Sequence, residues 1–441
     1  MRERVSHVPA FVRQWLLIIA LFQLVTCDLN ADDFTFRHVA SMPTSYDDNF
    51  RHAVVAVSAE QTALIARNYI RVGSSQQINW LRDHPERRGN RLFTRNAEND
   101  EPTHLTDSTT FGFIPNSSLA YALICNGRIY FWDTESKRKL TTELTHDVAS
   151  ECAGPGPAVS PDGKLIATQT MDALQLWHVP SFERAAGDVE KNWSRDMAFS
   201  SDGLFLFHRE KHQLSVRNAK SGQLIVAPFR HDLICKGFCY SAESQRIVTI
   251  ENSSQKEAEW SSTAVIRSIA DGSELNRVVL PAISREAMWL SPNQILVVAD
   301  EKHSDRQPPY TYGRNSVYMI SLKGSDASIS LIDRHSWIRN LKVNQGSQSY
   351  IVQTRDWTHC RKIDESAPVW ARSPSEYAAF GDGNWVLLQH GRTAIVCSLT
   401  DGKELRRWND VELSRVDGPS IWLLRNENAD VWHVETRKPT P

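Results

Sequence analysis

The sequence predicts an all-β fold in which small four-stranded antiparallel sheets repeat along the chain and close into a ring. Short apolar runs, rich in Val, Ile, Leu, Phe and Trp, alternate with turn-forming residues throughout the chain. The same turn recurs at a near-constant spacing, with Gly163 of "SPDG" and Gly203 of "SSDG" 40 residues apart. Apolar-periodic stretches long enough for a helix are absent after the amino terminus.

Each repeated unit predicts four strands. A polar turn leads into a first apolar run such as "KLIATQT", and a second run follows that often ends near a Trp, as in "ALQLWHV". A further turn, such as residues 400–403, then leads into a more polar stretch that is suited to the wet outer edge of a sheet. The units after the amino-terminal region start near residues 109, 157, 196, 236, 286, 339, 376 and 413.

A sheet of this kind has two faces that need covering, so the copies are expected to pack side by side around an axis. A weaker half-unit at His52–Ile70 and a last unit that ends without an outer strand suggest that the two chain ends share one blade. Counted in this way the chain gives eight blades, and seven is the alternative if the unit from Leu341 is a long connection.

The units resemble the blades of WD-repeat β-propellers. The resemblance covers the chain from about Thr109 to its end and implies a propeller fold. The Gly-His pair of the family is missing from every unit, and the Trp-Asp dipeptide occurs once in its usual slot, which indicates a divergent propeller. The motifs that carry the resemblance are Asp162-Gly163, Asp202-Gly203, Trp132-Asp133 and Trp177.

The amino terminus predicts export. Arginines at positions 2, 4 and 13 precede the apolar run at Trp15–Val25, which is short for a membrane span, and a polar stretch follows. Residues 1–27 are therefore interpreted as a signal peptide, residues 28–50 as a leader or linker and residues 51–441 as a single propeller. "LVTC" resembles a bacterial lipobox that would lipidate Cys27, although Thr26 departs from the pattern, and an uncleaved anchor is the other alternative.

Composition limits the class of partner. Lys and Arg number 50 against 52 Asp and Glu, for a net charge of −2, which argues against a nucleic-acid-binding surface over the whole molecule. The chain holds seven cysteines, too few for a disulfide framework in a protein of this length. Besides Cys27 they are Cys125, Cys152, Cys235, Cys239, Cys360 and Cys397, and the sequence leaves their disulfide state open.

No catalytic or metal-binding motif appears in the sequence. His208 and His212 flank a hairpin tip and are expected to be two exposed histidines rather than metal ligands, because two ligands are fewer than zinc needs. Asp162 and Asp202 are expected to shape turns. Most of the 14 Trp residues fall at repeated strand positions and predict core packing, whereas Trp80, Trp260 and Trp357 lie in less regular stretches and are the candidates for exposure.

Two long interruptions are candidates for binding loops, since such loops on a rigid scaffold often carry function. They are Asp83–Ser108, which is polar and poor in strand signals, and Ala299–Ser316, which lengthens one hairpin.

These features predict an exported, periplasmic or secreted interaction scaffold without catalytic activity, metal or cofactor, which binds a protein or peptide on one face. The alternative is a propeller enzyme or cofactor-binding protein with a site at the mouth of the central channel.

Overall fold

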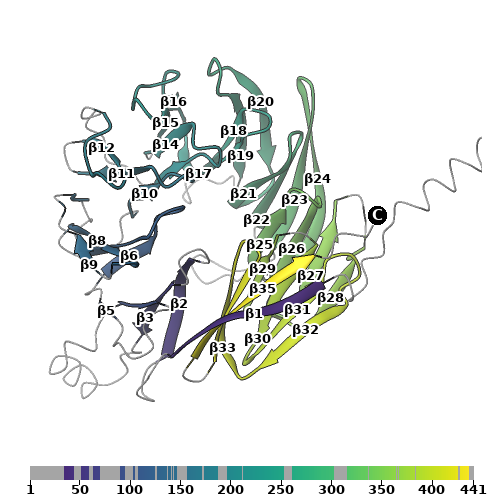
Figure 1. The fold of residues 1–441 in the computed structure, drawn as a ribbon. Helices are drawn as coiled ribbons and strands as arrows, with labels where there is room; N and C mark the ends of the chain where they lie inside the picture. The colour runs from purple at the N-terminus through teal and green to yellow at the C-terminus, as the bar shows by residue number, and fades with distance from the viewer. Residues whose placement is uncertain are drawn as a thin grey trace, which may run out of the picture.

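The computed structural model describes residues 34–43, 51–58, 63–69, 90–94 and 103–104, and residues 108–436 with gaps, the longest being 147–155, 187–195, 253–260 and 302–314. All regular elements in this part of the chain are strands, arranged as antiparallel sheets around an axis (Figure 1). Eight sheets have four strands, as predicted, and one sheet has three. The fold is a β-propeller. No helix within the described ranges has the length and apolarity needed to cross a bilayer.

The first three sheets in chain order comprise β2 (Arg51–Ser58), β3 (Ala63–Tyr69), β4 (Asn90–Thr94) and β5 (Thr103–His104); β6 (Ser108–Phe113), β7 (Leu119–Ile124), β8 (Ile129–Asp133) and β9 (Arg138–Leu140); and β10 (Ala158–Val159), β11 (Leu165–Gln169) and β12 (Leu174–His178). In the last, three-stranded sheet, Trp177 makes a single bridge to Arg184 where an outer strand would run.

The next three sheets comprise β13 (Asp196–Phe199), β14 (Phe205–Arg209), β15 (Gln213–Asn218) and β16 (Phe229–Arg230); β17 (Ile234–Ser241), β18 (Arg246–Asn252), β19 (Ser262–Ser268) and β20 (Glu274–Leu280); and β21 (Ile283–Ser291), β22 (Gln294–Asp300), β23 (Asn315–Lys323) and β24 (Asp326–His335).

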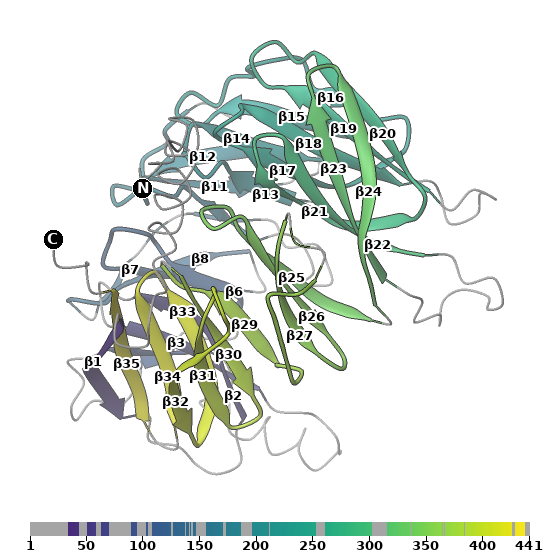
Figure 2. The same ribbon diagram turned by 90° about the vertical axis from the view of Figure 1, so that its right-hand side faces the viewer.

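The last three sheets comprise β25 (Ile338–Asn344), β26 (Ser349–Thr354), β27 (Thr358–Lys362) and β28 (Trp370–Arg372); β29 (Tyr377–Phe380), β30 (Trp385–His390), β31 (Thr393–Ser398) and β32 (Glu404–Asn409); and β33 (Val411–Asp417), β34 (Ser420–Arg425), β35 (Asn428–Thr436) and β1 (Phe34–Pro43). The first strand of each sheet lies on the inner side of the ring (Figures 1 and 2).

The two ends of the chain meet in one blade, as expected, but through a different segment. Strand β1 pairs with β35 from Phe34↔Thr436 to Pro43↔Asn428 and supplies the outer strand of the last blade. This segment lies within residues 28–50, which the sequence suggests are a linker. It is a strand because Phe34 is buried against the last two blades and Phe36 packs edge-on against Trp408.

The stretch Asp83–Ser108 also differs from its prediction as a strand-poor loop. It contains β4 and β5, which complete a sheet with β2 and β3. The half-unit at His52–Ile70 therefore belongs to a four-stranded sheet of its own. The other interruption, Ala299–Ser316, joins β22 to β23 as predicted, and its middle lies outside the described residues.

Apolar side chains from neighbouring sheets share the core. Val248 and Ile266 of one blade join a cluster with Trp289 of the next, and the same arrangement recurs around the ring. Trp289, Trp385 and Trp422 are buried almost completely. Each fully buried side chain of this size contributes about 1.5–3 kcal/mol, so the interfaces between blades hold most of the apolar stabilisation.

The repeated turn has a specific hydrogen-bond network. Asp162 Oδ1 accepts hydrogen bonds from Ser160 Oγ at 2.7 Å and from the Lys164 N–H at 3.1 Å. Asp202 accepts the equivalent bonds from Ser200 Oγ and the Leu204 N–H. The Ser160 bond lowers the pKa of Asp162, so this carboxylate stays charged and keeps the turn. Both aspartates shape turns, as predicted.

Gly163 also allows two blades to approach closely. Its φ is +70°, and a Cβ at this position would lie 1.7 Å from the carbonyl oxygen of Pro115 in the preceding blade. The "SPDG" turn therefore sets both a local backbone shape and the distance to the neighbouring sheet.

Buried polar side chains connect five successive blade junctions. Each lies where the second strand of a blade ends or the third begins, and each bonds the backbone near the start of the next blade. We call Arg209, Asn252, Asn315, Gln353 and Gln389 the junction residues; all five are under 9% exposed. Their bonds are Arg209 Nη1 to Cys235 O (2.6 Å), Asn252 Nδ2 to Ser284 O (3.1 Å), Ile338 N to Asn315 Oδ1 (2.6 Å), Gln353 Nε2 to Ser375 O (3.0 Å) and Gln389 Nε2 to Glu412 O (2.9 Å).

We predict that Gln389→Ala lowers the free energy of unfolding by about 2 kcal/mol, because it leaves buried backbone groups without partners. The Gln389 amide donates to the carbonyl of Glu412 and accepts from the N–H of Ser414 at 2.7 Å. Denaturant titration of the purified protein measures the change. The matched control is Gln223→Ala, which removes an exposed amide and is expected to change stability by no more than about 0.5 kcal/mol. Equal effects of the two substitutions would contradict the role of the junction residues.

Candidate functional site

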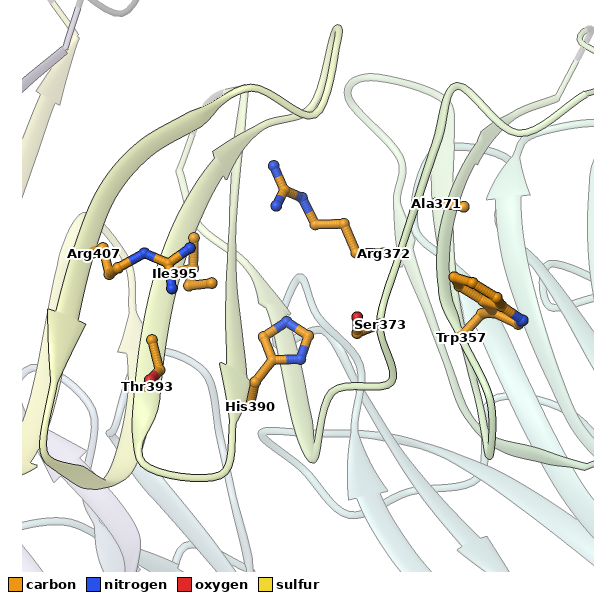
Figure 3. Close-up of a pocket in the computed structure, with 8 residues that line it drawn as sticks. All are labelled: Trp357, Ala371, Arg372, Ser373, His390, Thr393, Ile395 and Arg407. Carbon is orange, nitrogen blue, oxygen red and sulfur yellow. The ribbon is translucent and has the colours of Figure 1, made fainter.

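A pocket of about 500 Å³ lies between blade β25–β28 and blade β29–β32 (Figure 3). Its walls combine basic groups, hydroxyls and one large aromatic ring. The lining residues are Trp357, Ala371, Arg372, Ser373, His390, Thr393, Ile395 and Arg407.

A tight turn presents Trp357 to solvent. The turn joins β26 to β27, and Thr354 Oγ1 accepts the N–H groups of Asp356 (3.2 Å) and Trp357 (2.9 Å). The Thr354 N–H in turn donates to the Trp357 carbonyl at 2.8 Å. The Trp357 side chain is 53% exposed although most tryptophans of the described chain are buried. The prediction that Trp357 is exposed is therefore confirmed, and Trp80 and Trp260 lie outside the described residues.

The two arginines of the pocket have different degrees of charge compensation. Arg407 forms a bidentate pair with Glu404, at 2.8 Å (Nε–Oε1) and 2.5 Å (Nη2–Oε2), and this contact lowers the pKa of the Glu404 carboxyl. Arg372 donates to the carbonyl of Gly402 in the turn of the neighbouring blade. A carbonyl carries no full charge, so the guanidinium of Arg372 keeps its positive charge in the pocket.

His390 contributes a directed ring nitrogen. Its Nδ1 lies 2.9 Å from the carbonyl oxygen of Pro374. A carbonyl only accepts hydrogen bonds, so Nδ1 is the donor in this contact. Figure 3 shows Arg407 at one side of the pocket and Trp357 at the other, with His390 and the side chain of Arg372 between them.

This set of groups suits binding better than catalysis. A positive guanidinium, two hydroxyls and an exposed indole recognise a ligand with an acidic group beside an apolar or planar part. Nucleophilic catalysis needs a base bonded to the nucleophile. In the described part of the chain, no hydrogen bond joins Ser373 to His390.

The sequence indicated only one member of this pocket. Arg372, His390 and Arg407 come from three strands of two blades, and nothing in their local sequence separates them from other surface residues. Only the irregular context of Trp357 gave a signal.

The expectation of two exposed histidines at the 208–212 hairpin is wrong for His208. His212 is exposed, but His208 lies on β14 opposite Ser215 and is only 2% exposed. Along the strand Phe207 and Arg209 point to one face and His208 to the other, and both faces of β14 are covered because residues 206–209 are all buried. Burial, and secondarily the charge of Arg217, lowers the pKa of His208 to about 4.

Within the described ranges, no three His, Cys, Asp or Glu side chains are placed to hold a metal ion. The four described cysteines are free thiols: Cys235, Cys239, Cys360 and Cys397. Burial raises the pKa of Cys360 to about 12, which makes this thiol unreactive. Cys27, Cys125 and Cys152 lie outside the described residues.

No family model matches the chain, and no curated protein sequence matches it. Among solved structures, a eukaryotic initiation factor aligns with a TM-score of 0.54 at 13% identity, over 87% of this chain and 93% of its own. BamB from Moraxella catarrhalis has a TM-score of 0.42 at 10% identity, over 74% of this chain and 96% of its own.

The dihydro-heme d1 dehydrogenase NirN has a TM-score of 0.47 at 12% identity, over 98% of this chain and 87% of its own. At such identities the similarities show the fold alone. Similarity to solved structures therefore supports the fold, and membership of the WD-repeat family stays a prediction.

We predict that His208 makes stability depend on pH. The unfolded chain protonates this ring near pH 6.5 and the folded protein near pH 4, so the unfolded state binds more protons between these values. Stability therefore falls as the pH falls through this window, by about 2 kcal/mol between about pH 6.5 and pH 4.5 from this group alone. Denaturant titrations at the two pH values measure the loss.

The variant His208→Gln is expected to lose less stability on acidification than the unmodified protein, because Gln does not titrate. The control His178→Gln removes an exposed histidine and should leave the loss unchanged. An unchanged loss in His208→Gln would show that His208 is not the group responsible.

Proposed function

We propose that this protein is an exported β-propeller that acts as a non-catalytic scaffold for protein interactions, with a partner docked at the pocket between β25–β28 and β29–β32. The observation that carries the proposal is Trp357, which a hydrogen-bonded turn holds in solvent at the rim of a pocket with a charged arginine. Exposing an indole costs free energy that a binding partner recovers.

The residue types of the pocket support docking. Trp and Arg are enriched among the residues that dominate the affinity of protein interfaces, where they fill the desolvated centre of the contact. Trp357 and Thr393 lie at opposite sides of the pocket, and Arg372, Ser373 and His390 lie between them (Figure 3). A partner side chain that enters the pocket meets an apolar wall and a hydrogen-bonding wall at the same time.

Export is proposed from the basic and apolar pattern of residues 1–27, with the mature chain either free or tethered at Cys27. Cysteine burial supports it. In an oxidising compartment an accessible thiol risks unwanted disulfides, and Cys235, Cys360 and Cys397 are buried.

We predict that Trp357→Ala weakens capture of the natural partner by at least about tenfold, because the change removes the central apolar contact. The purified mature protein is used as bait in the envelope fraction of its natural host, and bound proteins are quantified by mass spectrometry.

The control bait is Val279→Ala, which removes a side chain that is 63% exposed on another blade and should capture the partner normally. Loss of the partner from both baits, or from neither, would contradict docking at the pocket. Recovery of a tightly bound small molecule with no protein would favour the cofactor-binding alternative.

We predict that the mature protein lacks the first segment of the sequence. Amino-terminal sequencing of protein from the natural host is expected to start near residue 28, with a lipid on Cys27 if the lipobox is used. An intact Met1 on cytosolic protein would reject export and would leave the docking proposal standing.

A further inference from the structure

In the described part of the chain, the first strands of six sheets carry one residue without a cross-strand partner close to the strand start, and in three successive blades that residue is basic. In β17, β21 and β25 the pairing register shifts by one residue close to the start of the strand. Such a bulge disrupts the ladder locally and re-aims a side chain. The extra residues are Lys236 between Cys235 and Gly237, Arg285 between Ser284 and Glu286, and Arg339 between Ile338 and Asn340.

All three extra residues are basic, and the bulges separate a buried residue from an exposed one. Cys235 is fully buried and Lys236 beside it is exposed. Ile338 is 3% exposed and Arg339 beside it is exposed. The bulge thus keeps the core contact of one residue while it turns the next residue to solvent.

The three positions belong to one face of the ring. Strands β17, β21 and β25 are neighbours on the inner side of the ring (Figure 1) and start at the same end of their blades. We call this end the upper face. Junction residues hold the backbone there, since Asn252 bonds the carbonyl of Ser284 and Asn315 bonds the N–H of Ile338. The bulges therefore sit on a backbone fixed before any ligand arrives, which lowers the entropic cost of binding.

The positive charge on this arc is largely uncompensated. Among the described residues, neither Lys236 nor Arg339 takes part in a salt bridge within 4.0 Å. Glu286, which follows the second bulge, faces the charge of Lys342 on the neighbouring strand; burial raises the pKa of Glu286 and Lys342 opposes that rise. The net charge of the chain is −2, so this arc is a local exception on a slightly acidic protein.

The arc adjoins the pocket. Ile338, next to Arg339, pairs with Thr354, which anchors the turn that carries Trp357. Arg339 and Trp357 are thus at the same end of the same blade, and Arg372 lies on the neighbouring strand, paired with Thr358 next to Trp357. Lys236, Arg339 and Arg372 therefore place positive groups along this end of the blades from β17 to the pocket.

We propose that the upper face of these blades docks an acidic polypeptide segment of the partner, with carboxylates on the basic arc and one side chain in the pocket. This inference rests on the proposed scaffold function and specifies the chemistry of the partner. A flexible acidic peptide can place separate carboxylates on separate blades, whereas a nucleic acid needs a broad basic surface that a chain of net charge −2 does not offer.

The test uses a fluorescein-labelled peptide of ten glutamates and fluorescence anisotropy. The unmodified protein is expected to bind it, more weakly at about 300 mM than at about 50 mM salt, because salt screens exposed charges. The double variant Lys236→Glu/Arg339→Glu is expected to bind about tenfold more weakly. Circular dichroism and a thermal melt check that the variant is folded.

The matched control is Lys220→Glu/Lys323→Glu, which makes the same change in net charge. Lys220 and Lys323 are exposed; Lys220 lies in the turn after the third strand of its blade and Lys323 ends the third strand of another, at the end opposite to the upper face. This control should retain the affinity of the unmodified protein. Equal losses in the two double variants would show a general charge effect and overturn the proposal, as would absence of binding at low salt.

A ten-nucleotide thymidine oligonucleotide of the same charge is measured in parallel. Tighter binding of the oligonucleotide than of the peptide, lost in Lys236→Glu/Arg339→Glu, would overturn the choice of an acidic polypeptide. The two proposals fail separately. A partner captured through Trp357 without affinity for the glutamate peptide refutes the acidic segment alone, whereas peptide binding without any captured protein refutes the scaffold function.

Discussion

The fold depends on buried hydrogen bonds that join neighbouring blades at five successive junctions of the ring. Sheets of four short strands cannot cover their own faces, and apolar packing between them is not directional. The junction residues orient neighbouring blades, because their side chains form hydrogen bonds with particular backbone groups of the following blade. These residues are Arg209, Asn252, Asn315, Gln353 and Gln389. Because an unpaired buried amide is costly, only one relative placement of two blades satisfies both sides. The junctions therefore fix where the first strand of the following blade begins along the axis of the ring.

The surface chemistry follows from that placement. The side chains of the proposed binding site lie at or near strand ends, where the junctions hold the backbone and the pairing between strands ends. Trp357 stands on a three-residue turn, His390 ends β30, and the bulges of β17 and β25 lie within two pairs of their strand starts. A bulge in the middle of a strand would break more of the ladder, so the end of the strand is where an extra residue disturbs least. The sheets thus present these side chains at defined positions along one end of the blades.

Local patterns predicted much of this architecture. The "SPDG" and "SSDG" turns, the apolar runs and the Trp positions follow from near neighbours in the chain, and Asp162 and Trp177 lie where they were expected. The closing strand was missed because Phe34–Pro43 has a weak alternation and finds its partner about 390 residues away. His208 was misjudged because the charged residues that follow it, Arg209, Glu210 and Lys211, made the end of a buried strand look like a loop. The pocket and the junctions join residues of different blades, and no single stretch of sequence contains both halves.

The pairing of β1 with β35 makes the ring a structure that only a finished chain can complete. Arg37 and Glu435 form a salt bridge across the outermost pair of strands at opposite ends of the sequence. Until Asn428–Thr436 has been synthesised, β1 has no partner and the first blade has no neighbour on one side. A partial chain therefore keeps an unpaired edge strand, and its ring stays open. A protein shortened at either end exposes the same edge to pairing with other chains. Closure of the ring therefore waits until Asn428–Thr436 has been synthesised.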